Sequence, residues 1–377
     1  MTCSLLLGWL STACNGPFRV GEMDIDAYDN AATSMGGSST LVGSAGTTTV
    51  GGAGADIAEM GTAGARETDT VCDVPTYEVA ALEPPFAAPE VVWQRLSLWL
   101  NGDVIDSPIP FPQSTTYKWA GQVAVAAFTL SEQLDVNLAA HAKRRFLENS
   151  FDLEPGSMAL DYWTNRLKER GDPLQLLYAT PGEDHRMGIF GDPEWLTRHP
   201  RAVSRGVNIL RGVFNQVVPP PPPSVNKTLP EDQANLTARQ RLEQHRADST
   251  CNACHILIDP LGLSLEHFDE VGNYRELDAD QPIDSSGTYR SNFGGERFTF
   301  TSMEDLAPQL ASSCQARIAF ADLHLKRALL DAGLLVGDED IALEHQEDLA
   351  RVRQAFLPQQ AYPTLILAIA QTSAFLR

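Results

Sequence analysis

Apolar residues recur at helical spacing over most of the chain that follows residue 77. In residues 114–151 this spacing predicts two helices, separated near Thr129–Ser131. A further helix is predicted at 158–170, where Gly171 and Pro173 should end it. The same pattern predicts helices from 238 toward the cysteines and at 302–313, 314–332, 338–356 and 362–377. We therefore expect a mainly α protein.

Local signals at several helix ends support this prediction. Thr237 and Gln240 have the spacing of a capping box, in which each side chain bonds the backbone N–H of the other residue. Gly333 follows the helix that it should stop, and Pro363 suits the first turn of the last helix. Residues 282–300 have turn residues between short β-prone runs, which predicts a small β-hairpin element.

The first 75 residues have a different character. An apolar run, Leu5–Leu10, is followed by Ser11–Ala13 and then Cys14, which is the order of a lipoprotein export signal. No Lys or Arg precedes the run, and Ser11 stands where a larger aliphatic residue is usual. Residues 15–75 are rich in Gly, Ser, Thr and Ala, without an apolar period. We predict an export signal at 1–14, lipidation of Cys14, and a disordered tether at 15–75.

The remainder of the chain divides into three predicted domains. We expect a helical domain at 76–180, a cytochrome c-like haem-binding helical domain at 181–297, and a C-terminal helical domain at 298–377. The polyproline run Pro219–Pro223 is expected to be a stiff connector within the second domain.

Charge and hydropathy limit the partners. The net charge is −21 and the pI is about 4.7, which excludes a nucleic-acid partner, because phosphate binding requires a basic surface. No apolar run reaches the roughly 18–20 residues that cross a bilayer. We therefore expect membrane attachment through the lipid anchor only, in an exported protein that is a periplasmic or cell-surface lipoprotein.

Cys251, Cys254 and His255 form the pattern C-x-x-C-H, which is the attachment sequence of haem c. Two thiols three positions apart on a helical turn can each add to one vinyl group of the porphyrin. The imidazole of the next residue, His255, is then placed to bind the iron. The sequence thus predicts one covalent haem c.

Other uses of the cysteines remain open. A zinc site would need a second ligand pair, and the remote pair Cys314 and His324 has poor ligand spacing. A disulfide or redox pair between Cys251 and Cys254 is the other alternative, although no predicted strand precedes the motif as in thioredoxin-like units.

The segment from His185 to Arg290 resembles a domain of unknown function found in planctomycete-type cytochrome proteins. Besides C-x-x-C-H, the resemblance rests on Arg186–Gly188, Arg205–Gly206, Pro219–Pro223, His245, Ile258–Gly262, Glu266–Asp269, Val271–Arg275 and Asp284–Gly287. Residues 303–377 are similar to the helical domain that usually follows it, and residues 96–170 weakly resemble the helical domain that usually precedes it.

Two departures from this family pattern matter. Longer members carry an additional cytochrome-like domain upstream, where this chain has the tether, so the resemblance implies a single haem. Members also commonly have a cysteine just before the Pro-rich run, where this chain has Asn215 or Gln216. The resemblance pairs that cysteine with the one matching Cys314, which would here be free or would pair with Cys72.

Several residues are candidates for contacts around the haem. In such folds a backbone carbonyl after the motif accepts the second ring N–H of the axial histidine, and Pro260 is our candidate. Arg275, or else Arg246, could pair with the haem propionates. The candidates for the sixth iron ligand are His245, Met303 and Met187.

The predicted function is electron transfer by a mono-haem c-type cytochrome whose redox partner protein is unknown. One alternative is a peroxidase-type haem enzyme, for which Glu266 and His267 would be the first acid–base candidates. The other is a non-haem surface interaction module with a Cys251–Cys254 disulfide.

Overall fold

The computed structural model describes residues 72, 82, 86–104, 140–168, 171–219, 235–291, 295–337, 341 and 345–377. All of them belong to one compact unit, Glu67–Arg377. The predicted export signal with Cys14, the tether apart from Cys72, the connector beyond Pro219 and most of the helical stretch before residue 140 lie outside the described residues. The predicted domain boundaries at 180/181 and 297/298 fall inside the compact unit and stay predictions.

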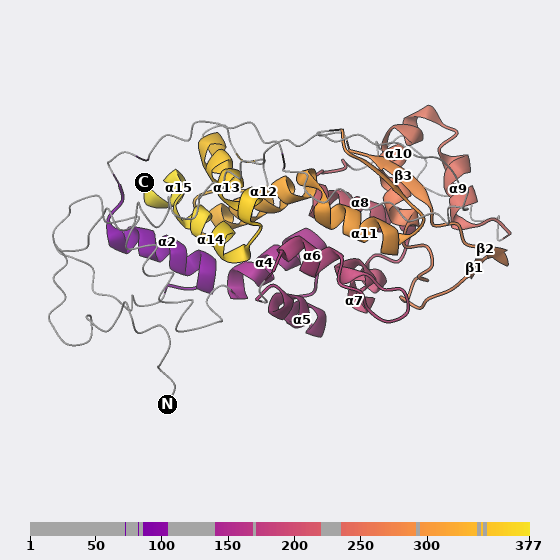
Figure 1. Ribbon diagram of the computed structural model, residues 1–377, viewed down its shortest axis with the longest axis horizontal. Coiled ribbons are helices and arrows are strands. Elements are labelled where there is room, and N and C mark those ends of the chain that lie inside the picture. Colours follow the sequence, from indigo (N-terminus) through magenta and orange to yellow (C-terminus); the bar gives the residue numbers. More distant parts are fainter. Residues whose placement is uncertain are drawn as a thin grey trace, which may run out of the picture. The chain divides into compact units, whose positions relative to one another are not determined.

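The described part of the chain is mainly helical, as predicted, with two small antiparallel strand pairs (Figure 1). Its helices are α2 (Pro89–Asn101), α4 (Ala140–Phe151), α5 (Met158–Arg166), α6 (Pro173–Tyr178), α7 (Pro193–Arg198), α8 (Ala202–Phe214), α9 (Ala238–His245), α10 (Ser249–Leu263), α11 (Met303–Ser312), α12 (Cys314–Asp331), α13 (Gln346–Gln359), α14 (Tyr362–Ala370) and α15 (Ser373–Leu376). A 3-10 turn, η1, spans Gly188–Gly191. The strands are β1 (Leu277–Asp278), β2 (Gln281–Pro282), β3 (Gly287–Arg290) and β4 (Arg297–Phe300).

Several of the residues predicted to begin or end helices lie at actual helix ends. Thr237 and Gln240 form the capping box at the start of α9, with both reciprocal hydrogen bonds present. Gly333, with a φ of 70°, follows the end of α12. Pro363 lies in the first turn of α14. The local chemistry of these ends was therefore predicted correctly.

Aspartate–proline pairs account for one set of errors. Pro173, predicted to end a helix, instead begins α6, and the Asp172 side chain accepts a hydrogen bond from the Leu174 N–H. Asp192 and Pro193 begin α7 in the same way. Proline suits a first helical turn because the N–H that it lacks has no partner there in any case. The sequence prediction also missed α2 and α8, and it extended α5 beyond its actual end at Arg166.

One large buried apolar cluster runs from α2 to α15. It includes Trp99 of α2, Phe146 of α4, Trp195 of α7, Tyr289 of β3 and Phe375 of α15. All three predicted domains contribute to it, so burial of apolar surface holds their described residues together.

Helices α8 and α10 cross so closely that a glycine is needed on each of them. A Cβ atom on Gly206 of α8 would lie 2.1 Å from the carbonyl oxygen of Ile258, and one on Gly262 of α10 would lie 1.8 Å from that of Ala202. Both distances are far below van der Waals contact, so no larger residue fits without moving a helix. This crossing fixes α10, which carries the cysteine motif, against the core.

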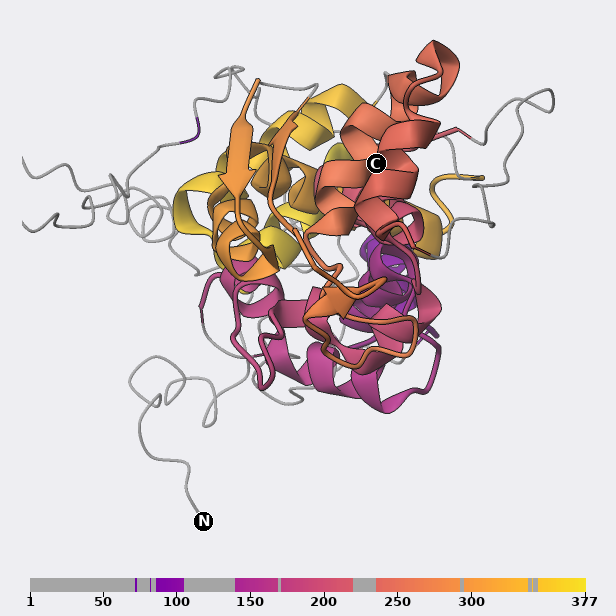
Figure 2. The same cartoon turned by 90° about the vertical axis from the view of Figure 1, so that its right-hand side faces the viewer.

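The predicted hairpin element is present. Strands β3 and β4 pair from Gly287↔Phe300 to Arg290↔Arg297, and Figure 2 shows them as two orange arrows side by side. Strand β3 contacts α10, and β4 contacts α11. The smaller pair, β1 and β2, joins Leu277 to Pro282.

A disulfide joins Cys72 to Cys314, the first residue of α12, across 242 positions of sequence. Cys314 was expected either to be free or to pair with Cys72, and it pairs with Cys72. Its sulfur is therefore not a zinc ligand. Among the described residues, no helix combines the length and the apolar character that a membrane crossing requires.

Candidate haem-attachment site

Helix α10 presents the C-x-x-C-H motif at its outer end. Asp248 caps the helix, because its side chain accepts a hydrogen bond from the Thr250 N–H. Cys251 is half-buried, Cys254 is exposed, and both thiols are free. From Ile258 onward the helix is mostly buried in the core. The motif therefore faces outward from a helix whose other half is held rigidly.

The imidazole of His255 is held by a carboxylate. Its Nδ1 lies 2.7 Å from Oδ1 of Asp259, four residues later on the same face of α10. The His255 side chain is 16% exposed and that of Asp259 is 1% exposed. Nε2 of His255 has no hydrogen-bond partner in the described part of the chain, so this nitrogen is available to a ligand.

This carboxylate replaces the carbonyl that we expected. Pro260 lies inside α10, not in a loop, and its carbonyl accepts the Ser264 N–H at 3.3 Å. Because α10 continues through Pro260 to Leu263, the Asp259 side chain comes to lie one turn from His255. The helical i,i+4 spacing of His255 and Asp259 is visible in the sequence and was the signal for this contact.

Arg246, the C-cap residue of α9, also reaches Asp259. Its Nε lies 3.5 Å from Oδ2 of Asp259, and among the described residues both atoms are buried without a hydrogen bond. A cation next to the motif is therefore supplied by Arg246. Arg275 instead pairs with Glu266 and with Asp278, the latter at 3.0 Å.

His245 lies directly beside His255, with ring centroids 4.7 Å apart and ring planes at 74°. Burial and the neighbouring His255 lower the pKa of His245. The structure thus brings His245 to the motif, in edge-to-face contact with His255.

The structure places the methionine candidates elsewhere. Met303 is 2% exposed, and its N–H bonds the carbonyl of Ser264, just beyond the far end of α10. That end is about 12 Å from His255, since a helix rises by 1.5 Å per residue. The Met303 thioether therefore does not reach the motif in this arrangement. Met187 is 8% exposed in the core before η1.

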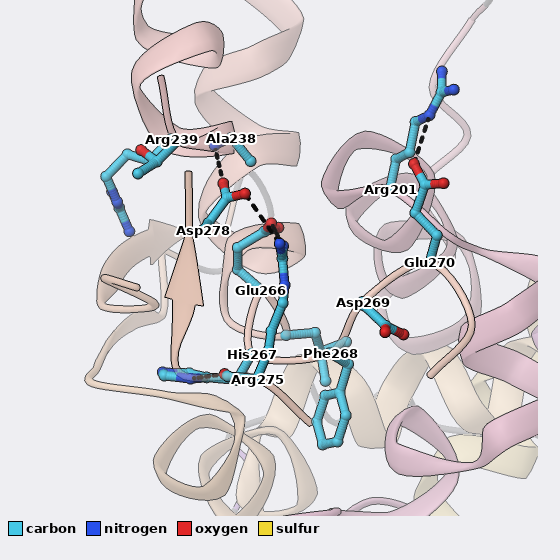
Figure 3. Close-up of polar contacts among 12 residues, drawn as sticks. Arg201, Ala238, Arg239, Glu266, His267, Phe268, Asp269, Glu270, Arg275 and Asp278 are labelled. Carbon is cyan, nitrogen blue, oxygen red and sulfur yellow. Dashed lines mark hydrogen bonds and ion pairs between the residues drawn. The ribbon is translucent and has the colours of Figure 1, made fainter. Parts of the chain in front are cut away.

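Glu266 and His267, the acid–base candidates, also lie beyond the far end of α10, in the network around Arg275 (Figure 3). The Glu266 carboxylate binds Arg275, and Nδ1 of His267 lies 2.9 Å from the Arg275 carbonyl oxygen. Burial raises the pKa of Glu266 to about 6, although Arg275 and Arg205 lower it. Asp278 links this network to α9 by accepting the Ala238 N–H at 2.5 Å.

Two arginines, Arg205 and Arg186, hold the turn that follows α10. Arg205 is 1% exposed and donates to the carbonyls of His199, Leu265, Phe268 and Asp269 at 2.8–2.9 Å. Burial lowers the pKa of Arg205 to about 10. Arg186 donates to the carbonyls of Gly191 and Gly272, each at 2.7 Å. These residues of the family pattern therefore build the support of α10 and do not contact the cysteine motif.

The arrangement fits a covalent haem better than a protein-only metal site. In the described part of the chain, no three His, Cys, Asp or Glu side chains cluster as metal ligands. His324, the other zinc candidate, is buried, with Nδ1 at 2.8 Å from the Phe320 carbonyl and Nε2 at 3.0 Å from the Tyr362 hydroxyl. A porphyrin would bring four nitrogen ligands of its own. The chain would then need to supply only the thiols of Cys251 and Cys254 for attachment and the imidazole of His255 as an iron ligand.

Comparison with known proteins agrees with the sequence resemblance. Residues 186–278 match the model of the family described as PSCyt3, a protein of unknown function (DUF1588). The segment that contains α7 to α10 is thus similar to a cytochrome-type domain, and the suspected resemblance is confirmed over this range. No curated protein and no solved structure matches the chain.

Proposed function

We propose that the chain binds one haem c through Cys251 and Cys254, with His255 as axial ligand, and that it transfers electrons. The observation that carries this proposal is the C-x-x-C-H face of α10, on which Cys254 is exposed, Cys251 is half-buried and Asp259 orients the imidazole of His255. When bound, the haem supplies a one-electron iron couple. The chain's own residues anchor it, orient its axial ligand and leave it near the surface.

The surroundings of the motif suit contact with a partner protein. Ile256, which follows His255, is 54% exposed and gives the surface an apolar residue next to the motif. Exposure of this half of α10 leaves a short path for an electron to a docked partner.

We also propose that the protein is exported. Disulfides persist in oxidising compartments, and the Cys72–Cys314 bond therefore supports an exported protein. Haem c is attached outside the cytoplasm, which agrees with export. We propose attachment to a membrane through lipidated Cys14 alone, as a periplasmic or cell-surface lipoprotein.

One observation favours the peroxidase-type alternative. A carboxylate bonded to the axial histidine makes the imidazole a stronger donor, which stabilises the oxidised iron that such enzymes use. Against it, Glu266 and His267 lie beyond the opposite end of α10 from His255 and are engaged with Arg275. The non-haem module is disfavoured because Cys251 and Cys254 are free.

A pyridine haemochrome spectrum tests the proposal. The chain, produced with the haem c maturation machinery, should be red and should keep its colour after acid–acetone extraction. The double variant Cys251→Ser/Cys254→Ser should be colourless with an unchanged circular dichroism spectrum. His255→Ala should lose the native haem spectrum, whereas His185→Ala, at another partly exposed histidine, should keep it. In the source cells, Cys14→Ala should release the red protein from the membrane fraction.

The ferric spectrum then separates the two haem functions. A low-spin spectrum that cyanide and peroxide leave unchanged supports electron transfer, and a high-spin, peroxide-reactive spectrum supports the enzyme. A folded but colourless wild-type protein contradicts both.

A further inference from the structure

Asp259 is a buried carboxylate that contacts two charged or ionisable side chains, His255 and Arg246. Only 1% of its side chain is exposed, and Oδ1 lies 2.7 Å from Nδ1 of His255. Burying a carboxylate is costly unless a cation or hydrogen bonds compensate it. Arg246 supplies the cation, with Nε 3.5 Å from Oδ2. The three side chains His255, Asp259 and Arg246 thus form a chain of contacts from α10 to the end of α9.

The hydrogen bond determines which ring nitrogen holds the proton. Because a carboxylate only accepts, Nδ1 of His255 must donate, and the lone pair of a neutral imidazole is then on Nε2. An ionised acceptor also leaves more electron density on the imidazole than a neutral carbonyl does. A ligand of this kind stabilises an oxidised metal more than a reduced one.

We propose that Asp259 is a positioning residue that makes His255 an electron-rich axial ligand and so lowers the reduction potential of the haem, while Arg246 moderates this effect through Asp259. This inference rests on the proposed function, because it concerns the haem that His255 would bind. It adds to that function the direction of the potential and the two residues that set it.

The test is the midpoint potential of red protein, measured by spectroelectrochemical titration in the wild type and in the variants Asp259→Asn and Arg246→Gln. Asp259→Asn should raise the potential enough to change the ratio of oxidised to reduced haem tenfold at a fixed ambient potential, which is about 59 mV for one electron. Arg246→Gln should lower it. In the Asp259→Asn background, Arg246→Gln should change the potential little, because its effect passes through Asp259.

Asp248→Asn is the matched control. It removes the same charge three residues before Cys251, from an exposed cap position where asparagine serves as well as aspartate. The midpoint potential of Asp248→Asn should stay at the wild-type value, whereas that of Asp259→Asn should be raised.

The results distinguish a failure of the proposed function from a failure of the proposed role of Asp259. A colourless wild type contradicts the proposed function. If the variants are red and Asp259→Asn changes the potential no more than Asp248→Asn, the function stands and the role of Asp259 is wrong. If Asp259→Asn does not fold, Arg246→Gln decides, because an unchanged potential in that variant contradicts the inference and a lowered one supports it.

Discussion

Glu266 is a carboxyl group that the fold buries beside arginines, and burial affects its pKa more than the arginines do. Its side chain is 8% exposed and binds Arg275, yet its pKa is raised to about 6 from an ordinary value of 4.5. The folded protein therefore binds this proton more tightly than the unfolded chain does. The resulting stabilisation is complete below pH 4.5 and is lost as the pH rises through 6.

Glu266→Gln should remove this pH dependence. The free energy of unfolding of the wild type, relative to that of the variant, should fall by about 2 kcal/mol between pH 4.5 and pH 7. Urea unfolding at several pH values measures the difference. Glu243→Gln, at an exposed position of α9, should leave the pH profile parallel to that of the wild type. Parallel profiles for Glu266→Gln as well would refute a raised pKa.

At the scale of elements, the crossing of α8 and α10 positions the cysteine motif. Gly206 and Gly262 let the two backbones approach, and Arg205 ties α8 to the turn after α10 through three backbone carbonyls. All three residues were noticed in the sequence as parts of a family pattern. Their roles were not predicted, because a close approach of two backbones depends on residues some 50 positions apart.

The variant Gly206→Ala tests which has the larger effect on stability, the helix propensity of the residue or the close packing of α8 against α10. Helix propensity alone predicts that alanine stabilises α8 by up to about 1 kcal/mol. The contact with the Ile258 carbonyl predicts the opposite sign, a loss of about 2 kcal/mol or more, because one of the two helices must move. Urea unfolding monitored by circular dichroism gives the sign. A stabilised variant would rule out the crossing as described.

At the scale of the whole unit, the Cys72–Cys314 bond restricts the unfolded chain more than any local contact can. It closes a loop whose ends are 242 positions apart. Loop-closure entropy grows with loop length, so the expected stabilisation of the folded state is on the order of 5 kcal/mol.

Cys72→Ser/Cys314→Ser should therefore lower the midpoint of thermal unfolding markedly. Thermal scans with and without a reductant check this, because the reductant should destabilise the wild type and leave the double variant unaffected. The reductant does not break thioether bonds to a haem, so Cys251 and Cys254 do not contribute to the change in the unfolding midpoint. A wild type that is indifferent to reductant under unfolding conditions would contradict the prediction.

The sequence by itself determined what local chemistry decides. Apolar spacing predicted α4, α5 and α11 to α14 but not α2, α8 or α10; Thr237 and Gln240 predicted the start of α9, and the C-x-x-C-H pattern located the candidate site. It failed at α6 and α7, where an Asp–Pro pair begins a short helix with few apolar repeats to reveal it.

Only the tertiary structure decided which distant groups meet. It brought His245 and Arg246 to the motif and separated Met303 and Glu266 from it. Burial and backbone approach depend on how helices pack, and the spacing within one helix does not contain that information.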